Sequence, residues 1–338
     1  MCTDGTCPGT LNGTTHSLWR CSRRHWGTWI SILDARIGGL QASTQNTLHT
    51  SNTLQNNTLH NNTLHKKEVC LISWNSRGSS NQKLQFTNQL VSPQVVGDKI
   101  PIICNQENFI LKANIYRLKR AIPGFQFYIN PAVKNVQDVG RPMNGMFICV
   151  PDTIKNSVQD VSPGSQAVII SSSKSRTLLI NSYFPTDQHE GQGQAKPELE
   201  ETLAVIQNLI RNTEHDAVAW VGDINSDFSR NSRHSSAVYD AVIESNLEVT
   251  WERFRVDFTH TYEREGNTYL STLDHFFLNE QLMTNVKDAS VIHHPDNVSD
   301  HKLIYCNFKS IIIPQSVTSA GHPGGGPAWR RRNTTATC

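Results

Sequence analysis

Residues 216–225 read DAVAWVGDIN, and the fold prediction depends most on the pattern in this stretch. A short apolar run that includes Trp220 is typical of a buried β-strand, and the run ends at Asp223 and Asn225. A strand that ends in polar residues carries its last side chains to the rim of a sheet, where another molecule can reach them. We therefore expect a buried strand with functional side chains at its carboxyl end.

The same pattern recurs on both sides of this stretch. The strand candidates are VCLISWN, IPIICNQE, MFICVP, QAVIISS, RTLLINSYF, DAVAWVGDIN, TLDHFFLN, ASVIHH and KLIYCNF. Residues 197–211 place Leu199 and Leu203 at helical spacing after Pro197, and residues 235–245 indicate a shorter helix. Because strands and helices alternate, the sequence predicts an α/β fold.

The chain divides into one candidate domain between two tails. Residues 1–67 are polar and end in the imperfect repeat NTLHTSNTLQNNTLHNNTLH, which predicts a disordered low-complexity tail. Residues 68–309 contain every strand candidate, and a hydrophobic content of 37% over 338 residues allows a sizeable core. Residues 310–338 are expected to form a linker or tail rich in proline, glycine and arginine, as if a further domain followed.

The distribution of charge limits what the candidate domain can bind tightly. The whole chain has a formal charge of +2, but residues 68–308 contain 21 Lys and Arg against 27 Asp and Glu, which gives 21 − 27 = −6. Affinity for a phosphate backbone depends on Lys and Arg contacts. Such a domain should hold DNA weakly unless its positive charge is concentrated on one face.

The sequence also bears on the compartment. It has no run of eighteen apolar residues, and its first residues lack the basic and apolar segments of a signal peptide. We expect a nuclear or cytoplasmic protein that is neither secreted nor inserted in a membrane. Cys70, Cys104, Cys149 and Cys306 lie in strand-like runs and are expected to be small buried hydrophobic residues.

Polar residues gather at the ends of the predicted strands. They comprise four carboxylates, two amides, a tyrosine and a histidine: Asn75, Glu107, Tyr183, Asp223, Asn225, Asp274, Asp300 and His301. This set contains the groups needed to hold a hard divalent cation, orient a water molecule and stabilise a charged phosphorane. Each one alone is more often a turn residue or a helix cap, so the prediction depends on their occurring together.

Seven short motifs occur in an order that is typical of a known superfamily. They are SWNSRG (73–78), NQE (105–107), GRPMNGMFICV (140–150), NSYFPTD (181–187), VGDINSDF (221–228), STLDHFFLN (271–279) and SDHKLI (299–304). Together they resemble the endonuclease/exonuclease/phosphatase superfamily, and within it the apurinic/apyrimidinic-type endonuclease domains of LINE-like, non-LTR retrotransposons. The resemblance covers the whole candidate domain.

This resemblance implies a deoxyribonuclease I-like, four-layered fold, in which two packed mixed sheets are flanked by helices. It implies that Mg²⁺, or Mn²⁺ in its place, is held by Glu107 with Asn75 beside it and Asp300 near the metal. It further implies that Asp223 deprotonates the attacking water and that Asn225 holds this water or a phosphate oxygen. His301, oriented by Asp274, would donate to a non-bridging phosphate oxygen, and Tyr183 would contact the phosphate or the leaving oxygen.

The chain departs from the superfamily pattern at two places. Asn144-Gly145 replaces a glycine pair before MFICV, and Thr272-Leu273 replaces a basic-apolar pair before Asp274. Neither change removes a functional group. Tyr183 favours the DNA-cutting branch, because the deoxyribonuclease I, sphingomyelinase and deadenylase branches place a histidine near this strand end.

Basic and polar residues near these motifs are candidates for binding substrate. Lys112 and Arg120 follow Glu107, and Arg141 precedes the MFICV strand, so they could form an edge that grips phosphate; a solvated helix face explains the Lys112–Arg120 group equally well. Thr261 falls where the superfamily often contacts DNA, although a β-rich hairpin explains it equally well.

The favoured function is a Mg²⁺-dependent, DNA-nicking endonuclease of retrotransposon origin. A reverse transcriptase domain of the parent polyprotein would supply effective concentration on nucleic acid, and the chain itself is expected to be a monomer. One alternative keeps the fold but acts as a phosphodiesterase or phosphatase on abasic DNA, RNA or a phosphorylated small molecule. Another is an inactive, domesticated binding module.

Overall fold

The structure is a computed structural model that describes residues 68–134, 140–162, 164–172, 175–186, 195–230, 232–254, 260–264 and 269–309. The two expected tails, residues 1–67 and 310–338, lie outside these ranges. None of the helices in the described ranges is both long and apolar enough to cross a membrane.

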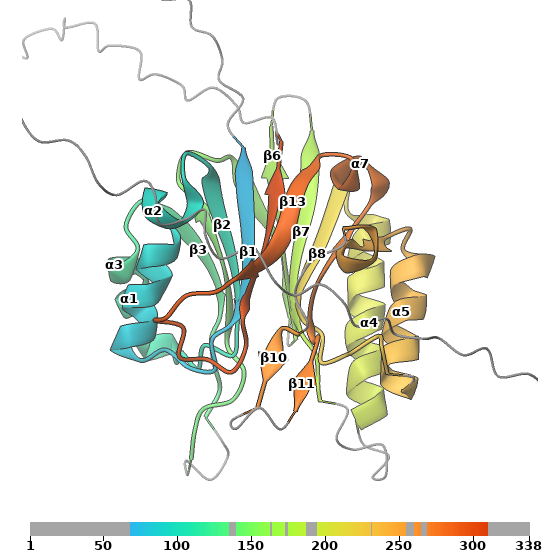
Figure 1. Ribbon diagram of the computed structural model, residues 1–338, viewed down its shortest axis with the longest axis horizontal. Helices are drawn as coiled ribbons and strands as arrows, with labels where there is room; N and C mark the ends of the chain where they lie inside the picture. The colour runs from blue at the N-terminus through green and yellow to red at the C-terminus, as the bar shows by residue number, and fades with distance from the viewer. Residues whose placement is uncertain are drawn as a thin grey trace, which may run out of the picture. The chain divides into compact units, whose positions relative to one another are not determined.

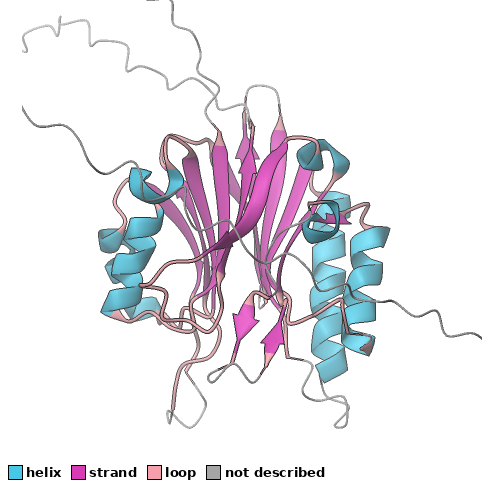
Figure 2. Ribbon diagram, in the orientation of Figure 1, coloured by secondary structure: helices cyan, strands magenta, loops and turns pink. Residues whose placement is uncertain are grey.

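Two six-stranded sheets form the centre of the domain (Figures 1 and 2). The first sheet has the order β13 (Val286–Ile292), β14 (Leu303–Phe308), β1 (Val69–Asn75), β2 (Ile100–Gln106), β4 (Met146–Pro151), β3 (Phe125–Asn130). The second has the order β5 (Asn156–Ser162), β6 (Ser165–Ser171), β7 (Arg176–Tyr183), β8 (Ala217–Asp223), β12 (Asp274–Leu278), β9 (Glu248–Val249). A small hairpin pairs β10 (Tyr262–Glu263) with β11 (Leu270–Ser271). Both large sheets are mixed, because β1 and β2 are parallel, as are β7 and β8, while the other pairs are antiparallel.

Helices cover the outer face of each sheet, which gives four layers (Figure 1). The inner faces share one apolar cluster, in which Ile148 of the first sheet joins Leu179 and Phe276 of the second. On the outer faces, α1 and α3 pack on the first sheet, and α4 and α5 pack on the second. The helices are α1 (Asn81–Leu90), α2 (Pro93–Val96), the 3₁₀ turn η1 (Lys112–Asn114), α3 (Ile115–Ala121), α4 (Ala195–Asn212), α5 (Arg233–Glu244), α6 (Thr250–Arg253) and α7 (Glu280–Met283). This is the fold that the sequence predicted.

Most of the expected elements are confirmed. All nine strand candidates form strands, and the two expected helices correspond to α4 and α5. Cys70, Cys104, Cys149 and Cys306 are buried and free, as expected. The sequence did not predict α1, because only Leu84, Phe86 and Leu90 interrupt its polar residues; these three are buried against the first sheet.

The topology brings the ends of several strands to one rim. Because β1 and β2 are parallel neighbours, Asn75 lies beside Gln106, and the parallel pair β7 and β8 places Tyr183 beside Asp223. β12 runs antiparallel to β8 and starts at this same edge, so its first residue, Asp274, pairs with Asp223. β14 is antiparallel to β1 and starts near the end of that strand. Strand starts and strand ends therefore meet where the two sheets adjoin.

Candidate active site

The rim collects the polar residues that the sequence singled out. Asn75, Tyr183 and Asp223 end their strands, Asp274 begins a strand, Glu107 directly follows β2, and Asp300 and His301 lie just before β14. A cavity of about 480 Å³ opens there, and Glu107, Tyr183, Asp223, Asn225 and His301 line it. Residues that are far apart in the chain thus face one cavity.

A close approach between two strands positions the end of β8. Gly222 has a φ of +144°, and a Cβ atom at this position would lie 2.0 Å from the backbone oxygen of Ser182. Only glycine allows β7 and β8 to come so near. Beyond it, the Asn225 N–H donates to Asp223 Oδ1 over 3.0 Å, and the Asn225 side chain donates to the Phe184 oxygen over 2.7 Å. These bonds hold Asp223 and Asn225 in place at the edge of the cavity.

Asn75 connects the two sheets at the centre of the site. Its side-chain NH₂ donates to Glu107 Oε2 over 2.9 Å and to Asp223 Oδ2 over 2.8 Å. Its side-chain oxygen accepts from the Arg77 N–H over 3.0 Å. An amide oxygen has two lone pairs, so this bond leaves one of them free, and the expectation that Asn75 is a metal ligand stays a prediction. The NH₂ group positions two carboxylates.

A second chain of contacts runs from Asp223 through His301 to Asp274. His301 Nε2 lies 3.7 Å from Asp223 Oδ2, and His301 Nδ1 lies 3.0 Å from Asp274 Oδ2. Thr261 donates its hydroxyl to the same Asp274 oxygen over 2.7 Å, and this hydroxyl accepts from the Asp274 N–H over 3.0 Å. All four residues are buried. The imidazole is therefore fixed between two carboxylates.

Burial and charge shift the pKa values of these groups. Burial by itself would lower the pKa of His301, but the carboxylates of Asp274 and Asp223 outweigh it and raise this pKa to about 9. Burial raises the pKa of Asp223 to about 7, although the neighbouring His301 opposes the rise. Burial, with Glu107 and Asp223 nearby, also raises the pKa of the Tyr183 hydroxyl. The two carboxylates therefore favour the protonated form of His301, and burial favours the protonated form of Asp223.

Two groups of residues at the rim could hold a metal ion. Asp223, Asp274 and His301 bring ligand atoms within 4.8 Å of one another. In that trio, however, Asp274 Oδ2 and His301 Nδ1 are already hydrogen-bonded to each other. Glu107 and Asp300 offer carboxylate oxygens, the ligands that Mg²⁺ prefers, and Asp300 Oδ1 is buried without a hydrogen-bond partner. Asp274 Oδ1 is likewise buried without a hydrogen-bond partner, so each group keeps a carboxylate oxygen available to a hard divalent cation.

Sequence reasoning missed two residues that shape this site. The Arg77 guanidinium donates to Asp300 Oδ2, and its Nε lies 3.9 Å from Glu107 Oε2. The Ser299 hydroxyl donates to the Asn75 backbone oxygen over 2.8 Å and accepts from the His301 N–H over 3.2 Å. Both residues occur inside quoted motifs, SWNSRG and SDHKLI. A basic or hydroxyl side chain within two positions of a predicted site residue could have identified them.

The predicted substrate-binding residues lie in different places. Lys112 and Arg120 are exposed on η1 and α3, and neither lines the cavity. The Arg141 guanidinium lies over the ring of Phe109, 4.4 Å from its centroid. Phe109 follows Glu107 by two residues in the chain. Thr261 is a correction, because its buried hydroxyl serves Asp274 and does not face the cavity. Trp74 and Trp220 are fully buried core residues.

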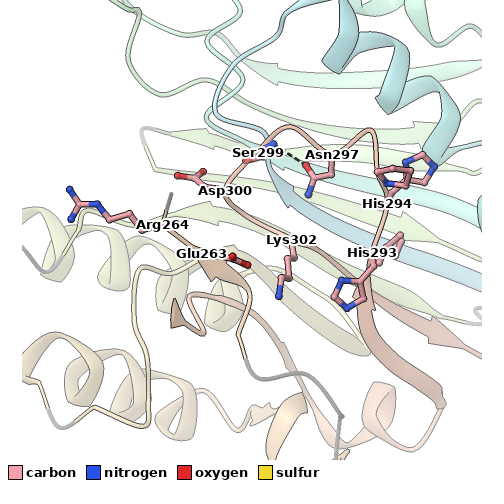
Figure 3. A pocket seen from close by; sticks show the side chains of 10 residues that line it. Glu263, Arg264, His293, His294, Asn297, Ser299, Asp300 and Lys302 are labelled. Carbon is pink, nitrogen blue, oxygen red and sulfur yellow. Dashed lines mark hydrogen bonds between the residues drawn. The ribbon is translucent and has the colours of Figure 1, made fainter. Parts of the chain in front are cut away.

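A second cavity of about 440 Å³ lies next to the first (Figure 3). Asp300 and Lys302 line it, while His301 between them faces the first cavity. Arg264, which precedes β11, lines both cavities. The start of β14 therefore separates two neighbouring hollows at the rim.

No protein-family model and no curated protein sequence matches the chain. Solved structures do. An AP endonuclease from Leishmania major superposes with a TM-score of 0.56 at 13% identity, over 72% of this chain and 88% of that one. The endonuclease domain of TRAS1, a telomere-specific non-LTR retrotransposon, gives 0.53 at 13% identity, over 72% and 98%. An endonuclease/exonuclease/phosphatase family protein from Leptotrichia buccalis gives 0.51 at 16% identity, over 71% and 99%.

These likenesses confirm the fold that the sequence motifs implied. The chain has the four-layered fold shared by apurinic endonucleases, a retrotransposon endonuclease and the endonuclease/exonuclease/phosphatase proteins. The two six-stranded sheets and their flanking helices are the common framework, and the cavity at the rim is where this chain places its acidic and histidine side chains.

Proposed function

We propose that the protein is a metal-dependent phosphodiester hydrolase, and specifically a DNA-nicking endonuclease of retrotransposon origin. One observation carries the proposal: an unbroken chain of contacts links Glu107, Asn75, Asp223, His301 and Asp274. Three of these residues, Glu107, Asp223 and His301, line one cavity. A carboxylate suited to metal, a carboxylate whose pKa is raised to about 7 and an imidazole whose pKa is raised to about 9 line this cavity, and together they support the proposal.

Each group has a defined task in in-line hydrolysis. Asp223 accepts the proton of the attacking water, since its raised pKa makes it a competent base near neutral pH. His301 donates to a non-bridging phosphate oxygen as negative charge develops, and Asp274 keeps the imidazole oriented and charged. Tyr183 and Asn225 line the same cavity and orient the phosphate. A Mg²⁺ or Mn²⁺ ion held by Glu107 and Asp300 would neutralise phosphate charge.

DNA is the proposed substrate. The cavity is bordered by the aromatic rings of Tyr183, Tyr262 and Tyr269, which suit bases and sugars, and by the cations Arg77 and Arg264. The likeness to the TRAS1 endonuclease domain supports a retrotransposon origin. The net charge of −6 (21 − 27) over residues 68–308 predicts weak intrinsic DNA affinity. We propose that a reverse transcriptase domain in the parent polyprotein compensates by tethering a monomeric nuclease to nucleic acid, in the nucleus or cytoplasm.

The test is nicking of supercoiled plasmid by the purified protein over a Mg²⁺ titration. Glu107→Gln keeps the shape of the side chain but removes a charge, so activity should fall at limiting Mg²⁺ and recover in part at high Mg²⁺. His301→Ala should lose roughly a hundredfold in rate, and added metal should not restore it. If Glu107→Gln cuts like the wild type at limiting Mg²⁺, the proposed metal site is wrong.

Parallel reactions decide the substrate class. The same protein is tested on an abasic duplex, on single-stranded RNA and on a phosphorylated small molecule such as p-nitrophenyl phosphate. The proposal expects intact plasmid DNA to be cut with a rate that depends on His301. Preference for another substrate with the same His301 dependence would keep the mechanism and replace the substrate. No turnover of any of them would indicate a binding module.

A further inference from the structure

Arg77 is a cation fixed among the carboxylates of the proposed metal site. Its backbone is held at a φ of +45°, a conformation that non-glycine residues rarely adopt. The Arg77 N–H donates to Asn75, the Arg77 oxygen accepts from Lys83 Nζ over 3.0 Å, and the next N–H, of Gly78, donates to the Glu107 oxygen over 2.7 Å. The turn is therefore anchored on both sides, so the fold fixes the backbone from which the Arg77 side chain reaches the two carboxylates.

The guanidinium contacts the two carboxylates that are proposed to hold a metal. It donates to Asp300 Oδ2 and lies 3.9 Å from Glu107 Oε2. The Glu107 and Asp300 side chains are 15% and 23% exposed, so water screens these contacts only in part. A guanidinium keeps its charge at every accessible pH. Any divalent ion that binds these oxygens must therefore displace or repel a permanent positive charge.

Electrostatics gives the direction of this competition. Two cations that share the same carboxylates repel each other, and the repulsion is doubled when one of them is Mg²⁺ or Mn²⁺. Lys83 lies close to Arg77 and adds positive charge to the same side of the site. Removing the Arg77 charge should therefore strengthen metal binding.

The cavity offers the guanidinium a second partner. Arg77 lines the same hollow as His301 and Asn225, where a substrate phosphate is proposed to lie. A phosphate oxygen is a geometric match for the guanidinium fork, as a carboxylate is. An incoming phosphate can thus draw Arg77 away from Glu107 and Asp300 and leave their oxygens to the metal.

We propose that Arg77 gates divalent metal binding: its guanidinium competes with the metal for Glu107 and Asp300, and a substrate phosphate relieves that competition. The inference rests on the proposed function, because it requires that a metal bind at these two carboxylates. Metal binding and substrate binding then strengthen each other, and the coupling passes through one side chain.

The test measures Mn²⁺ affinity of the full chain by electron paramagnetic resonance, with no substrate present. Arg77→Gln removes the charge while keeping a polar side chain, and Arg77→Lys keeps the charge without the planar fork. Arg77→Gln should bind Mn²⁺ roughly tenfold more tightly than the wild type, and Arg77→Lys should lie between them. Circular dichroism checks folding, and the Lys variant keeps the test decisive if the Gln variant does not fold.

A matched control comes from the surface. Arg253 also lies between two carboxylates, 3.1 Å from Glu248 and 3.0 Å from Glu280. All three of these side chains are exposed, unlike the carboxylates beside Arg77. Arg253→Ala should leave Mn²⁺ affinity unchanged. A second measurement adds a short duplex with phosphorothioate linkages: it should raise the Mn²⁺ affinity of the wild type several-fold and that of Arg77→Gln much less.

The outcomes separate this inference from the proposed function. If Glu107→Gln weakens Mn²⁺ binding but Arg77→Gln leaves it unchanged, the metal site stands and the gating role of Arg77 is overturned. Equal effects of the duplex on the wild type and on Arg77→Gln would also overturn it. If Glu107→Gln changes Mn²⁺ affinity in neither the wild type nor the Arg77→Gln background, the metal site and the inference both fail.

Discussion

Asp274→Asn isolates the charge that keeps His301 protonated. Asp274 Oδ2 lies 3.0 Å from His301 Nδ1 and also accepts from Thr261 over 2.7 Å. Asparagine has nearly the same shape and can still accept a hydrogen bond from the imidazole. The substitution therefore removes the negative charge and leaves the packing of this buried group nearly unchanged.

The structure gives the size of the effect. His301 has a pKa of about 9 against an ordinary value of 6.5, a difference of 9 − 6.5 = 2.5, and Asp274 is the largest of the influences that raise it. Without that charge, burial pulls the pKa back toward 6.5. Asp223 and Asp300 still raise this pKa, so a full return to 6.5 is the upper limit of the effect. At that limit the protonated fraction of His301 at pH 8 falls from about 90% to about 3%, so activity should drop by up to roughly thirtyfold.

The assay is the pH dependence of kcat/KM for plasmid nicking between pH 5.5 and 9.5. In the wild type, activity should rise as Asp223 loses its proton near pH 7 and fall as His301 loses its proton near pH 9, with both values belonging to the coupled pair. In Asp274→Asn, the alkaline fall should move toward pH 6.5. Asp227→Asn is the matched control, because Asp227 accepts from Ser271 over 2.8 Å but does not contact His301. An alkaline limb that stays in place in Asp274→Asn would refute the reasoning.

Three further predictions concern stability. Because the folded-state pKa of His301 is raised, its contribution to stability is complete below pH 6.5 and is lost as pH rises through about 9. Between pH 6 and pH 9.5, the free energy of unfolding in urea should therefore decline more for the wild type than for His301→Asn, and equal declines would contradict this. Gly222→Ala forces a Cβ against the Ser182 backbone oxygen and should lower the free energy of unfolding by roughly 3 kcal/mol or more. Gly124→Ala, at a φ of +82° with open space around it, should lower it by only about 1 kcal/mol, and chemical denaturation of both variants measures the difference. A fragment of residues 67–310 should melt cooperatively at the temperature of the full chain, because the tails show no amphipathic pattern with which to dock, and a lower or broader transition would show that a tail belongs to the core.

Local pattern was sufficient for most of the framework. Strands such as DAVAWVGDIN were predictable because a fully buried strand must be apolar along its length and must end where polar residues begin. Helix α1 was not predictable in the same way, since its few apolar residues give a weak period and its helical state depends on packing against the first sheet. Thr261 shows a similar limit, because its type and position in the sequence suited a substrate contact as well as the buried hydrogen bond to Asp274 that the structure shows.

The amino-acid sequence indicates which residues stand at strand ends, because that property depends on neighbours in the chain. It could not determine which of those ends meet, because pairing and packing depend on residues far apart. Asn75 bonds Asp223 across 148 positions, and Arg77 reaches Asp300 across 223. Arg77 became part of the site only when the antiparallel pairing of β1 and β14 brought these segments together. The sequence thus supplied the chemical groups, and the packing of two sheets decided their geometry and their pKa values, since both depend on distance and burial in three dimensions.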